Sequence, residues 1–341
     1  RIVIKGYSRV WCCINFIETE FQLTISVIIS FFIIIRLCMS IQFNNQVAIV
    51  TGAGGGVGRQ HALALAARGA KVVVNDLGGS RDGTGGSVSA AQAVVNEIVA
   101  MGGEAMANGA SVTDFEAVQD MVKQAVDKWG RVDILVNNAG ILRDKTFAKM
   151  DLADFKTVID VHLMGAVNCT KAVWAQMIEQ KYGRIVMTTS STGLYGNFGQ
   201  SNYGAAKLAL VGLMQTLALE GAKHNIKVNS LAPTAATRMT EDLMTQEVLD
   251  MLNPAAITPA MLVLASEQAP TRMILCAGAG SFEAAHITLT QGIYLGQEAD
   301  TPEKLAQQLA QVADRNDEMV PQSGGQQGTT EITKAKQAKG V

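Results

Sequence analysis

Short apolar runs alternate with longer amphipathic segments through most of the chain, and this rhythm limits the possible fold more than any other feature. Continuous apolar runs are typical of parallel strands that are covered on both faces. The runs lie at Val47–Val50, Val72–Val74, Ile134–Val136, Ile185–Met187 and Val228–Leu231, and helical patterns lie at Gln60–Arg68, Ala90–Met101, Phe115–Trp129, Leu163–Gln180 and Tyr203–Lys223. The order predicts an α/β fold with a doubly wound parallel sheet and helices on both faces.

Composition excludes several classes of protein. The 341 residues carry 28 basic and 30 acidic side chains, a net charge of −2, so there is no basic surplus and no nucleic-acid partner is expected. After residue 38 the only cysteines are Cys169 and Cys276, with no clustered His beside them, so neither a metal site nor a disulfide framework is predicted. A reducing compartment suits two free thiols, and the terminal Lys339-Gly340-Val341 is not the Ser-Lys-Leu peroxisomal signal, so we expect a cytoplasmic location.

Residues 1–38 differ from the rest of the chain. They contain an uncharged run from Leu23 to Ile35, shorter than the ~20 residues of a membrane helix, and Arg36 follows it where small residues would precede a signal-peptide cleavage site. Because Met39 lies just before the first predicted strand, we expect a non-native upstream segment. A membrane anchor and an export signal remain alternatives, and no membrane contact is expected unless residues 1–38 are genuine.

One domain is predicted over residues 39–290, followed by a C-terminal extension over 291–341. Within the extension, Thr301 as N-cap and Pro302 at the first helical position predict a helix that continues to about Ala313. Beyond Pro321 the Gln, Gly and Thr content predicts a mobile tail.

A glycine-rich stretch, Thr51–Gly58, lies between the first predicted strand and the helix that follows it. Glycines let the backbone approach a pyrophosphate, and the helix N-terminus offers unpaired N–H groups and partial positive charge. Asp76 ends the next strand, 18 residues after Gly58, where a carboxylate can accept hydrogen bonds from ribose hydroxyls and repel a 2′-phosphate. The pattern predicts a Rossmann-type dinucleotide site that prefers NAD to NADP, with contacts from Gly52, Gly54, Gly56, Val57, Gly58 and Asp76.

Tyr203 and Lys207 are four residues apart and therefore share one face of a predicted helix. An ammonium one turn from a phenol favours the phenolate, so we expect Lys207 to lower the pKa of Tyr203 and make it an acid–base catalyst. Ser190 stands at the end of a strand, where the ligand crevice of such sheets lies.

Together these residues resemble the short-chain dehydrogenase/reductase family. The glycine motif, Asn137-Asn138-Ala139-Gly140, Ser190, Tyr203 and Lys207 stand in the family's order over about residues 44–285. The resemblance implies that Tyr203 transfers the hydroxyl proton, that Lys207 tunes it and binds the nicotinamide ribose, and that Ser190 binds the substrate oxygen. It also implies cofactor contacts from Ser111, Val112, Asn138, Ala139, Gly140, Tyr203, Lys207, Pro233 and Thr237.

Three positions depart from the family pattern. His162 stands where Asn usually helps to hold a water beside the lysine; we predict that His162 takes this catalytic role, with a packed helix histidine as the alternative. Ala110 replaces an Asp that usually meets the adenine amino group, and Pro233-Thr234 replaces Pro-Gly.

The substrate is predicted from a branch of the family. The insert Leu77–Ser87 and the segments Ile141–Asp144, Val161–Leu163 and Tyr195–Gln200 resemble the (3R)-hydroxyacyl-CoA dehydrogenase part of multifunctional enzyme type 2. That resemblance implies interconversion of a secondary alcohol and a ketone, (3R)-3-hydroxyacyl-CoA and 3-oxoacyl-CoA. A steroid or other hydroxy/ketone dehydrogenase and a catalytically silent nucleotide-binding scaffold are the alternatives.

Substrate contacts are expected from the segment 239–254, whose apolar residues suit an acyl chain or a steroid, or else pack as an amphipathic helix: Met239, Leu243, Met244, Val248, Leu249, Met251 and Leu252. Arg143 and Lys145 either meet coenzyme A phosphates or are solvated surface charges. By family analogy we expect a homodimer or homotetramer built through the helices at 115–129, 151–180 and 203–223.

Overall fold

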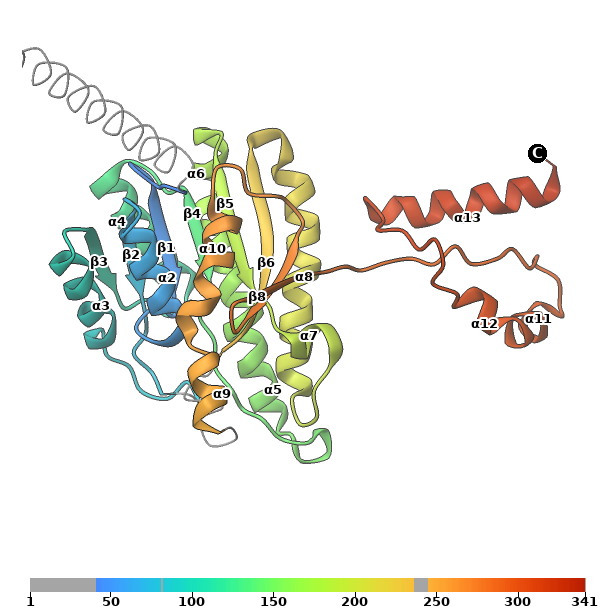
Figure 1. The fold of residues 1–341 in the computed structure, drawn as a ribbon, viewed down its shortest axis with the longest axis horizontal. Coiled ribbons are helices and arrows are strands. Elements are labelled where there is room, and N and C mark those ends of the chain that lie inside the picture. Colours follow the sequence, from blue (N-terminus) through green and yellow to red (C-terminus); the bar gives the residue numbers. More distant parts are fainter. Residues whose placement is uncertain (1–40, 81, 236–244, 341) are drawn as a thin grey trace, which may run out of the picture.

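The computed structural model describes residues 41–80, 82–235 and 245–340. Its centre is one eight-stranded sheet in the order β3-β2-β1-β4-β5-β6-β7-β8, in which only β8 is antiparallel to its neighbour (Figure 1). The strands are β1 (Val47–Thr51), β2 (Lys71–Asn75), β3 (Glu104–Asn108), β4 (Ile134–Asn137), β5 (Gly183–Thr188), β6 (Ile226–Thr234), β7 (Ile274–Gly278) and β8 (Ser281–Ala285). The predicted doubly wound sheet is confirmed. The expectation about residues 1–38 lies outside the described residues.

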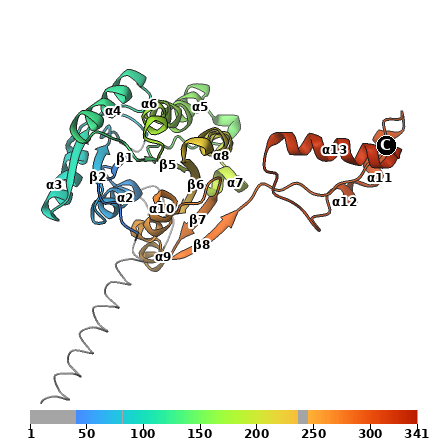
Figure 2. The ribbon, with the colours of Figure 1, turned by 90° about the horizontal axis from the view of Figure 1, so that it is seen from above.

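Helices cover both faces of the sheet (Figure 2). One layer holds α2 (Gly56–Ala66), α3 (Ser89–Ala100) and α10 (Thr258–Ala265), and the other holds α4 (Phe115–Trp129), α6 (Gly165–Gln180) and α8 (Ser201–Gly221). Shorter helices lie near the ends of the strands: α5 (Leu152–Ile159), the π-helix η2 (Asp160–Met164), α7 (Ser191–Tyr195) and α9 (Gln246–Met251), with the 3-10 turns Phe147–Lys149, Ala222–His224 and Pro254–Ile257.

The central strands are continuous apolar runs because both of their faces are covered. In β1, Ala48 and Val50 pack into the core under α2, α3 and α10, while Val47 and Ile49 pack into the core under α4, α6 and α8. All five residues of β1 and all four of β4 are buried. Every side chain of such a strand leaves water, which explains the absence of polar alternation.

The strand order places a crevice beside β1. The chain runs outward from β1 to β2 and β3, returns to β4 on the other side of β1, and continues to β7. Connections leaving β1 and β4 therefore diverge at the carboxyl ends of these strands, where ligands bind in open α/β sheets. In Figure 1 these ends point toward α9, at the bottom of the view.

Two helical stretches of the described chain, Ser201–His224 and Gln246–Ala265, are long and apolar enough to pass a compositional test for a membrane span. Leu210, Val211 and Met214 of α8 and Met261 and Leu264 of α10 are fully buried in the core clusters. Part of the apolar surface of each stretch is therefore buried in the protein core.

The C-terminal extension runs away from the sheet (Figures 1 and 2). It contains α11 (Thr301–Gln307), α12 (Leu309–Val312) and α13 (Gly324–Lys339). Asp300, rather than Thr301, is the N-cap of the first helix, and a break at Gln308 divides the predicted helix in two. Within the tail predicted beyond Pro321, helix-forming Glu, Lys, Ala and Gln residues after Thr330 support the helix α13 despite the glycines that open it. The mobility of the tail stays a prediction.

Candidate active site

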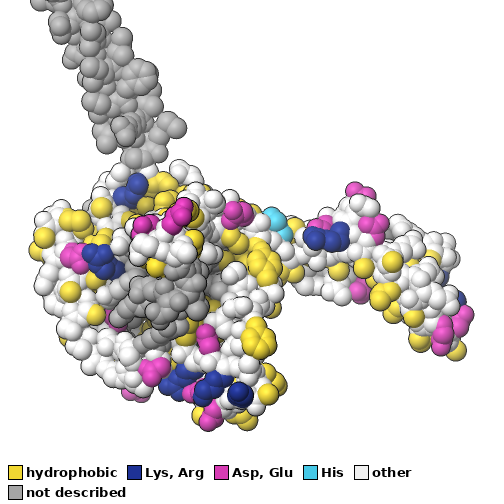
Figure 3. All heavy atoms as spheres, turned by 60° about the horizontal axis from the view of Figure 1, so that its bottom comes forward, with side chains coloured by type: hydrophobic (Ala, Val, Ile, Leu, Met, Phe, Trp, Pro, Cys, Tyr) yellow, Lys and Arg dark blue, Asp and Glu magenta, His cyan; other side chains and the backbone are white. Residues whose placement is uncertain are grey.

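A cleft of about 1190 Å³ opens at the carboxyl ends of the strands. Figure 3 shows the molecule from this end. The walls of the cleft are the glycine-rich turn, the residues after β2 and β4, the start of α8, and α9. Most of the predicted cofactor residues line it: Gly52, Gly54, Gly56, Val57, Gly58, Asp76, Ser111, Val112, Asn138, Ala139, Gly140, Tyr203, Lys207 and Pro233. Thr237 lies outside the described residues.

The glycine-rich turn packs directly against the residues after β4. Gly52 has φ +63°, and a Cβ at this position would lie 2.7 Å from the Cα of Ala139, so only glycine fits without a shift of backbone. The Asn138 side-chain amide donates to the carbonyls of Thr51 and Gly52, both at 3.0 Å. The amides of Asn138 and Ala139 donate to Thr51 Oγ1 at 3.0 and 3.1 Å. Thr51 therefore joins β1 to the Asn-Asn-Ala-Gly segment.

Asp76 holds the other side of the turn. Its Oδ2 accepts from the amide of Gly54 at 2.7 Å, and its Oδ1 accepts from the amide of Gly78 at 2.7 Å. A Cβ on Gly54 would lie 2.8 Å from the Asp76 carboxyl carbon. The carboxylate is thus fixed at the edge of the cleft by two backbone donors and one close approach.

Ser111 and Val112 continue this wall after β3. The Ser111 hydroxyl lies 2.8 Å from that of Thr113, and the carbonyl of Val112 accepts from Asn168 Nδ2 of α6 at 2.9 Å. Ala110 also lines the cleft, and its carbonyl accepts from Asn75 Nδ2 at 2.9 Å. Because Ala110 replaces the usual Asp, this position offers the cleft backbone atoms and no carboxylate.

Ser190 is hydrogen-bonded to Tyr203, and of these two residues only Tyr203 lines the cleft. Ser190 is the N-cap of α7, where its hydroxyl accepts from the amide of Thr192 at 3.2 Å. Burial raises the pKa of Tyr203, whereas a hydrogen bond with the Ser190 side chain lowers it in part. Tyr203 is thus a protonated phenol at neutral pH.

Lys207 is almost fully buried, and its Nζ donates to the carbonyl of Thr188 at 2.6 Å. The same atom lies 5.5 Å from the centre of the Tyr203 ring. Burial lowers the pKa of Lys207 to about 7, so the amine is only partly charged at neutral pH. The expected lowering of the Tyr203 pKa by Lys207 is therefore not met, because desolvation acts on both groups.

His162 lies in the π-helix and contacts the catalytic residues. Its Nε2 lies 3.1 Å from the amide nitrogen and 2.8 Å from the carbonyl oxygen of Ile141, and its ring packs edge-on against Tyr203 with 5.2 Å between centres. A Cβ on Gly140 would lie 2.3 Å from His162 Cε1, so this glycine makes room for the ring. Burial, together with the nearby positive charge of Lys207, lowers the pKa of His162 to about 3.

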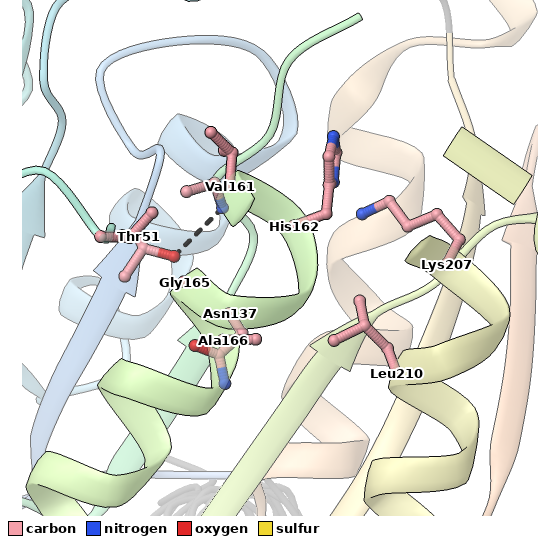
Figure 4. Close-up of a pocket in the computed structure, with 10 residues that line it drawn as sticks. Thr51, Asn137, Val161, His162, Gly165, Ala166, Lys207 and Leu210 are labelled. Atoms are coloured by element: carbon pink, nitrogen blue, oxygen red, sulfur yellow. Dashed lines mark hydrogen bonds between the residues drawn. The ribbon is translucent and has the colours of Figure 1, made fainter. Parts of the chain in front are cut away.

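A small cavity of about 10 Å³ lies between these groups (Figure 4). The Lys207 amine extends toward His162, and Thr51 lies on the opposite side, where its Oγ1 accepts the amide of Ala139. Its volume is close to the smallest that holds one water. Within the described residues, His162 Nδ1 and Asn137 Oδ1 are buried without a hydrogen-bond partner.

Three further residues organise the site, and sequence reasoning did not single them out. Thr51 makes the contacts given above, Asn202 is fully buried beside Tyr203, and Gln200 joins the start of α8 to Asp144 through a 2.7 Å hydrogen bond. Asn202 accepts from the amide of Tyr203 at 2.7 Å and donates to the carbonyl of Arg143 at 2.9 Å.

The substrate side is partly polar. From α9 and the turn after it, Gln246, Leu249, Asp250, Asn253 and Pro254 line the cleft. Of the apolar residues predicted here, Leu249 lines the cleft, Val248 and Met251 are exposed, and Met239, Leu243 and Met244 lie outside the described residues.

Arg143 and Lys145 both pair with Asp154, at 2.9 and 3.0 Å. The Lys145 side chain is 50% exposed and that of Arg143 26%, and a contact of either with a coenzyme A phosphate stays a prediction. No group of three or more His, Cys, Asp or Glu side chains suited to a metal is present in the part of the chain that the structure describes.

A family model described as short chain dehydrogenase matches residues 46–248. The chain belongs to this family, and the predicted oxidoreductase acting on CH–OH groups is confirmed at that level.

Relatives place the chain more closely. It is 47% identical over 289 residues to peroxisomal multifunctional enzyme A of Dictyostelium discoideum, covering 84% of this chain and 64% of that enzyme. The structure of full-length peroxisomal multifunctional enzyme type 2 from Drosophila melanogaster matches with a TM-score of 0.71 and 35% identity, over 86% of this chain and 49% of that one. A 7α-hydroxysteroid dehydrogenase complexed with NADH and 7-oxo glycochenodeoxycholic acid matches with a TM-score of 0.63 and 31% identity, over 70% of this chain and 95% of that one. The chain thus spans about half to two thirds of these two multifunctional relatives and about a quarter to less than half of others.

Proposed function

We propose that the chain is an NAD-dependent dehydrogenase that interconverts (3R)-3-hydroxyacyl-CoA and 3-oxoacyl-CoA. The observation that carries this proposal is that Tyr203 and Lys207 line a cleft whose other end holds the glycine-rich turn and Asp76, with Ser190 hydrogen-bonded to Tyr203. Similarity to two multifunctional enzymes of the peroxisome supports the acyl-CoA class.

The residues present fit a dinucleotide. The helix α2 begins at Gly56 without a side-chain cap, so its first amides are free to meet a pyrophosphate, and a Cβ on Gly56 would meet nothing within 4 Å. Asp76 would hold the adenosine ribose and disfavour a 2′-phosphate, and Lys207 would hold the nicotinamide ribose. The chemistry that NAD would supply when bound is hydride transfer: it would accept a hydride from the alcohol carbon. The similar hydroxysteroid dehydrogenase complexed with NADH supports this cofactor class.

Tyr203 would exchange the proton of the substrate hydroxyl, while Ser190 donates a hydrogen bond to the substrate oxygen. The raised pKa keeps Tyr203 protonated at neutral pH, which suits donation to a ketone oxygen. Oxidation requires the phenolate, so turnover of the alcohol is expected to rise with pH more steeply than turnover of the ketone. Parallel pH profiles in the two directions measure this difference.

His162 would hydrogen-bond a group beside Lys207 and so support proton transfer. Its ring is neutral above pH 3 because its pKa is about 3, so its unpartnered Nδ1 can exchange hydrogen bonds beside Lys207 without adding charge. A His162→Phe variant should keep cofactor affinity and lower turnover about tenfold or more. The packed-histidine interpretation expects unchanged turnover in the folded variant.

The discriminating experiment is a substrate panel assayed with NAD and with NADP. We expect turnover of 3-hydroxyacyl-CoAs with NAD and weaker turnover of steroids and simple alcohols. Turnover of free ketones with none for 3-oxoacyl-CoA would reject the thioester assignment in favour of a steroid or related dehydrogenase, which the similarity to the 7α-hydroxysteroid enzyme supports. Cofactor binding without turnover of any substrate would favour the silent scaffold.

A homodimer or homotetramer and a cytoplasmic location stay predictions. The relatives with the same dehydrogenase region are named peroxisomal, so localisation of the tagged protein decides between the two compartments. Light scattering of the purified chain measures the oligomeric state.

A further inference from the structure

Arg143 connects the loop after β2, part of which lines the cleft, to α5, which is far from it in sequence. Its Nε donates to the backbone carbonyl of Asp82 at 3.1 Å, and its Nη1 donates to Asp154 Oδ1 at 2.9 Å. The side chain is only 26% exposed. One guanidinium therefore joins the loop after β2 to α5, because its rigid fork offers several donors in fixed directions.

The loop between Leu77 and Ser87, described apart from residue 81, forms the wall next to Asp76. The amide of Ser87 donates to the carbonyl of Leu77 at 2.8 Å, which closes the loop on itself. Inside it, the Asp82 carboxylate accepts from Ser80 Oγ at 2.5 Å and from the amide of Thr84 at 3.0 Å. Four of its residues, Leu77, Gly78, Gly79 and Ser80, face the cleft together with Gly83.

Among the described residues of the loop's outer part, few contacts reach the body of the protein. Among its described outer residues, Ser80 and Asp82–Gly86, hydrogen bonds run between loop residues, apart from the bond that Arg143 donates. A Cβ on Gly83 would lie 3.2 Å from Ile141 Cγ2, which shows that the loop tip also rests on the Ile141 side chain. Arg143 thus supplies the directional part of the attachment.

At its backbone, Arg143 is anchored to the catalytic helix. Its carbonyl accepts from Asn202 Nδ2 at 2.9 Å, and Asn202 is fully buried next to Tyr203. The neighbouring Asp144 accepts from Gln200 Nε2 at 2.7 Å. The loop beside the adenosine end and the start of α8 therefore share one fixed point.

We propose that Arg143 is a positioning residue that holds this loop over the adenosine end of the cleft and thereby slows release of the reduced cofactor. The inference rests on the proposed function, since it requires a nicotinamide dinucleotide in the cleft. Loss of one charge-assisted hydrogen bond corresponds to about a tenfold change in an equilibrium, and such changes fall mostly on the dissociation rate.

Lys145 provides a matched control. It donates to the same carboxylate, Asp154 Oδ2, at 3.0 Å, and within the described residues it makes no hydrogen bond to the loop. If both cations served a coenzyme A phosphate instead, both variants would raise the KM for the acyl-CoA and leave cofactor release unchanged.

The test is stopped-flow release of NADH from the full chain, with wild type, Arg143→Lys and Lys145→Gln compared. Lysine can keep the pair with Asp154 but lacks the second donor direction needed to reach the Asp82 carbonyl at the same time. We expect NADH to leave Arg143→Lys about tenfold faster, to leave Lys145→Gln at the wild-type rate, and hydrogen exchange of the loop to rise only in Arg143→Lys. The thermal midpoint of the cofactor-free variants should stay near wild type.

Release from Arg143→Lys at the wild-type rate overturns the inference and leaves the proposed function standing. Failure of the wild type itself to bind NADH overturns the proposed function and the inference with it. If Arg143→Lys does not fold, Asp154→Asn removes the carboxylate that orients Arg143 while keeping the arginine, and faster NADH release from it, relative to Lys145→Gln, supports the same role.

Discussion

On the cofactor side of the cleft, the chain is shaped by glycines and backbone groups, whereas on the side of Tyr203 it is shaped by buried polar side chains. The turn after β1 fits against Ala139 because Gly52 has no Cβ, and Asp76 fixes Gly54 through its backbone amide. Across the cleft, the polar side chains of Lys207, Asn202 and His162 are all nearly inaccessible to solvent. Steric fit thus governs one side and desolvation governs the other.

The two sides differ in what their construction costs in stability. A glycine in a tight approach needs no compensation beyond its backbone freedom. A buried amine or imidazole disfavours its charged form, which lowers the pKa of Lys207 to about 7 and that of His162 to about 3. The catalytic side is therefore expected to be less stable than an apolar equivalent, and the cofactor side is not.

Tyr203→Phe should produce the largest functional effect. Removing the phenol oxygen takes away the group that exchanges the substrate proton, so turnover should fall by about 10³-fold or more. The ring still packs against His162, so NADH affinity and the thermal midpoint should stay near wild type. Steady-state rates together with NADH titration measure both. Retained turnover in this variant would remove Tyr203 from the mechanism.

Much of the fold was predictable because its signals are local. Apolar runs marked β1, β2, β4, β5 and β6, and the four-residue spacing put Tyr203 and Lys207 on one helix face. Strand β3 reads Glu-Ala-Met-Ala-Asn and lies at the sheet edge, so it carries no apolar run. Helix α13 was hidden because composition alone suggested a mobile tail.

The site was predictable only where a motif encodes it. Thr51 reaches Asn138 across 87 positions, and Asn202 reaches Arg143 across 59, so neither contact leaves a local pattern. The pKa shifts of Tyr203 and Lys207 could not be predicted from the sequence either, because their spacing says nothing about how deeply each side chain is buried. Non-local contacts and desolvation are properties of the assembled sheet.

Gly52→Ala compared with Gly56→Ala tests the steric side. Both glycines have positive φ, +63° and +52°, but only the Cβ at residue 52 meets backbone, 2.7 Å from the Cα of Ala139. We expect Gly52→Ala to lower the free energy of unfolding by about 3 kcal/mol, and Gly56→Ala by about 1 kcal/mol from backbone strain alone. Urea unfolding of the cofactor-free variants checks this difference, and equal losses would refute the role of the Ala139 contact.

Lys207→Met tests the cost of desolvation. The unfolded lysine binds its proton up to about pH 10.5 and the folded one only up to about pH 7, so wild-type stability should rise with pH between these values. At pH 7 the methionine variant avoids this cost but loses the hydrogen bond to the carbonyl of Thr188. A net gain of about 2 kcal/mol and a midpoint higher by roughly 5 °C are expected, with turnover abolished.

Thermal scans from pH 7 to 10 measure both parts of that prediction. The wild-type midpoint should climb toward that of Lys207→Met as the pH rises. A variant less stable than wild type at pH 7, with the same pH slope, would show that the amine is not held at a desolvation cost.

His61 offers the same test away from the chemistry. It is fully buried on α2, its Nδ1 lies 3.2 Å from Thr258 Oγ1, and burial lowers its pKa to about 3. At a pH between the His61 pKa of 6.5 in the unfolded chain and about 3 in the folded chain, the unfolded chain binds one proton more than the folded chain. The free energy of unfolding should therefore fall as the pH falls, by about 1.4 kcal/mol per pH unit. Urea unfolding from pH 6.5 to 4.5 should show a shallower slope in His61→Phe than in wild type. Because His61 lies on the cofactor side and His162 on the catalytic side, an equal reduction of the slope in His162→Phe would mean that desolvation, where it occurs, costs the same on either side. The two sides would then differ in which groups they bury, and the free-energy cost of burying an ionisable group would be the same on both.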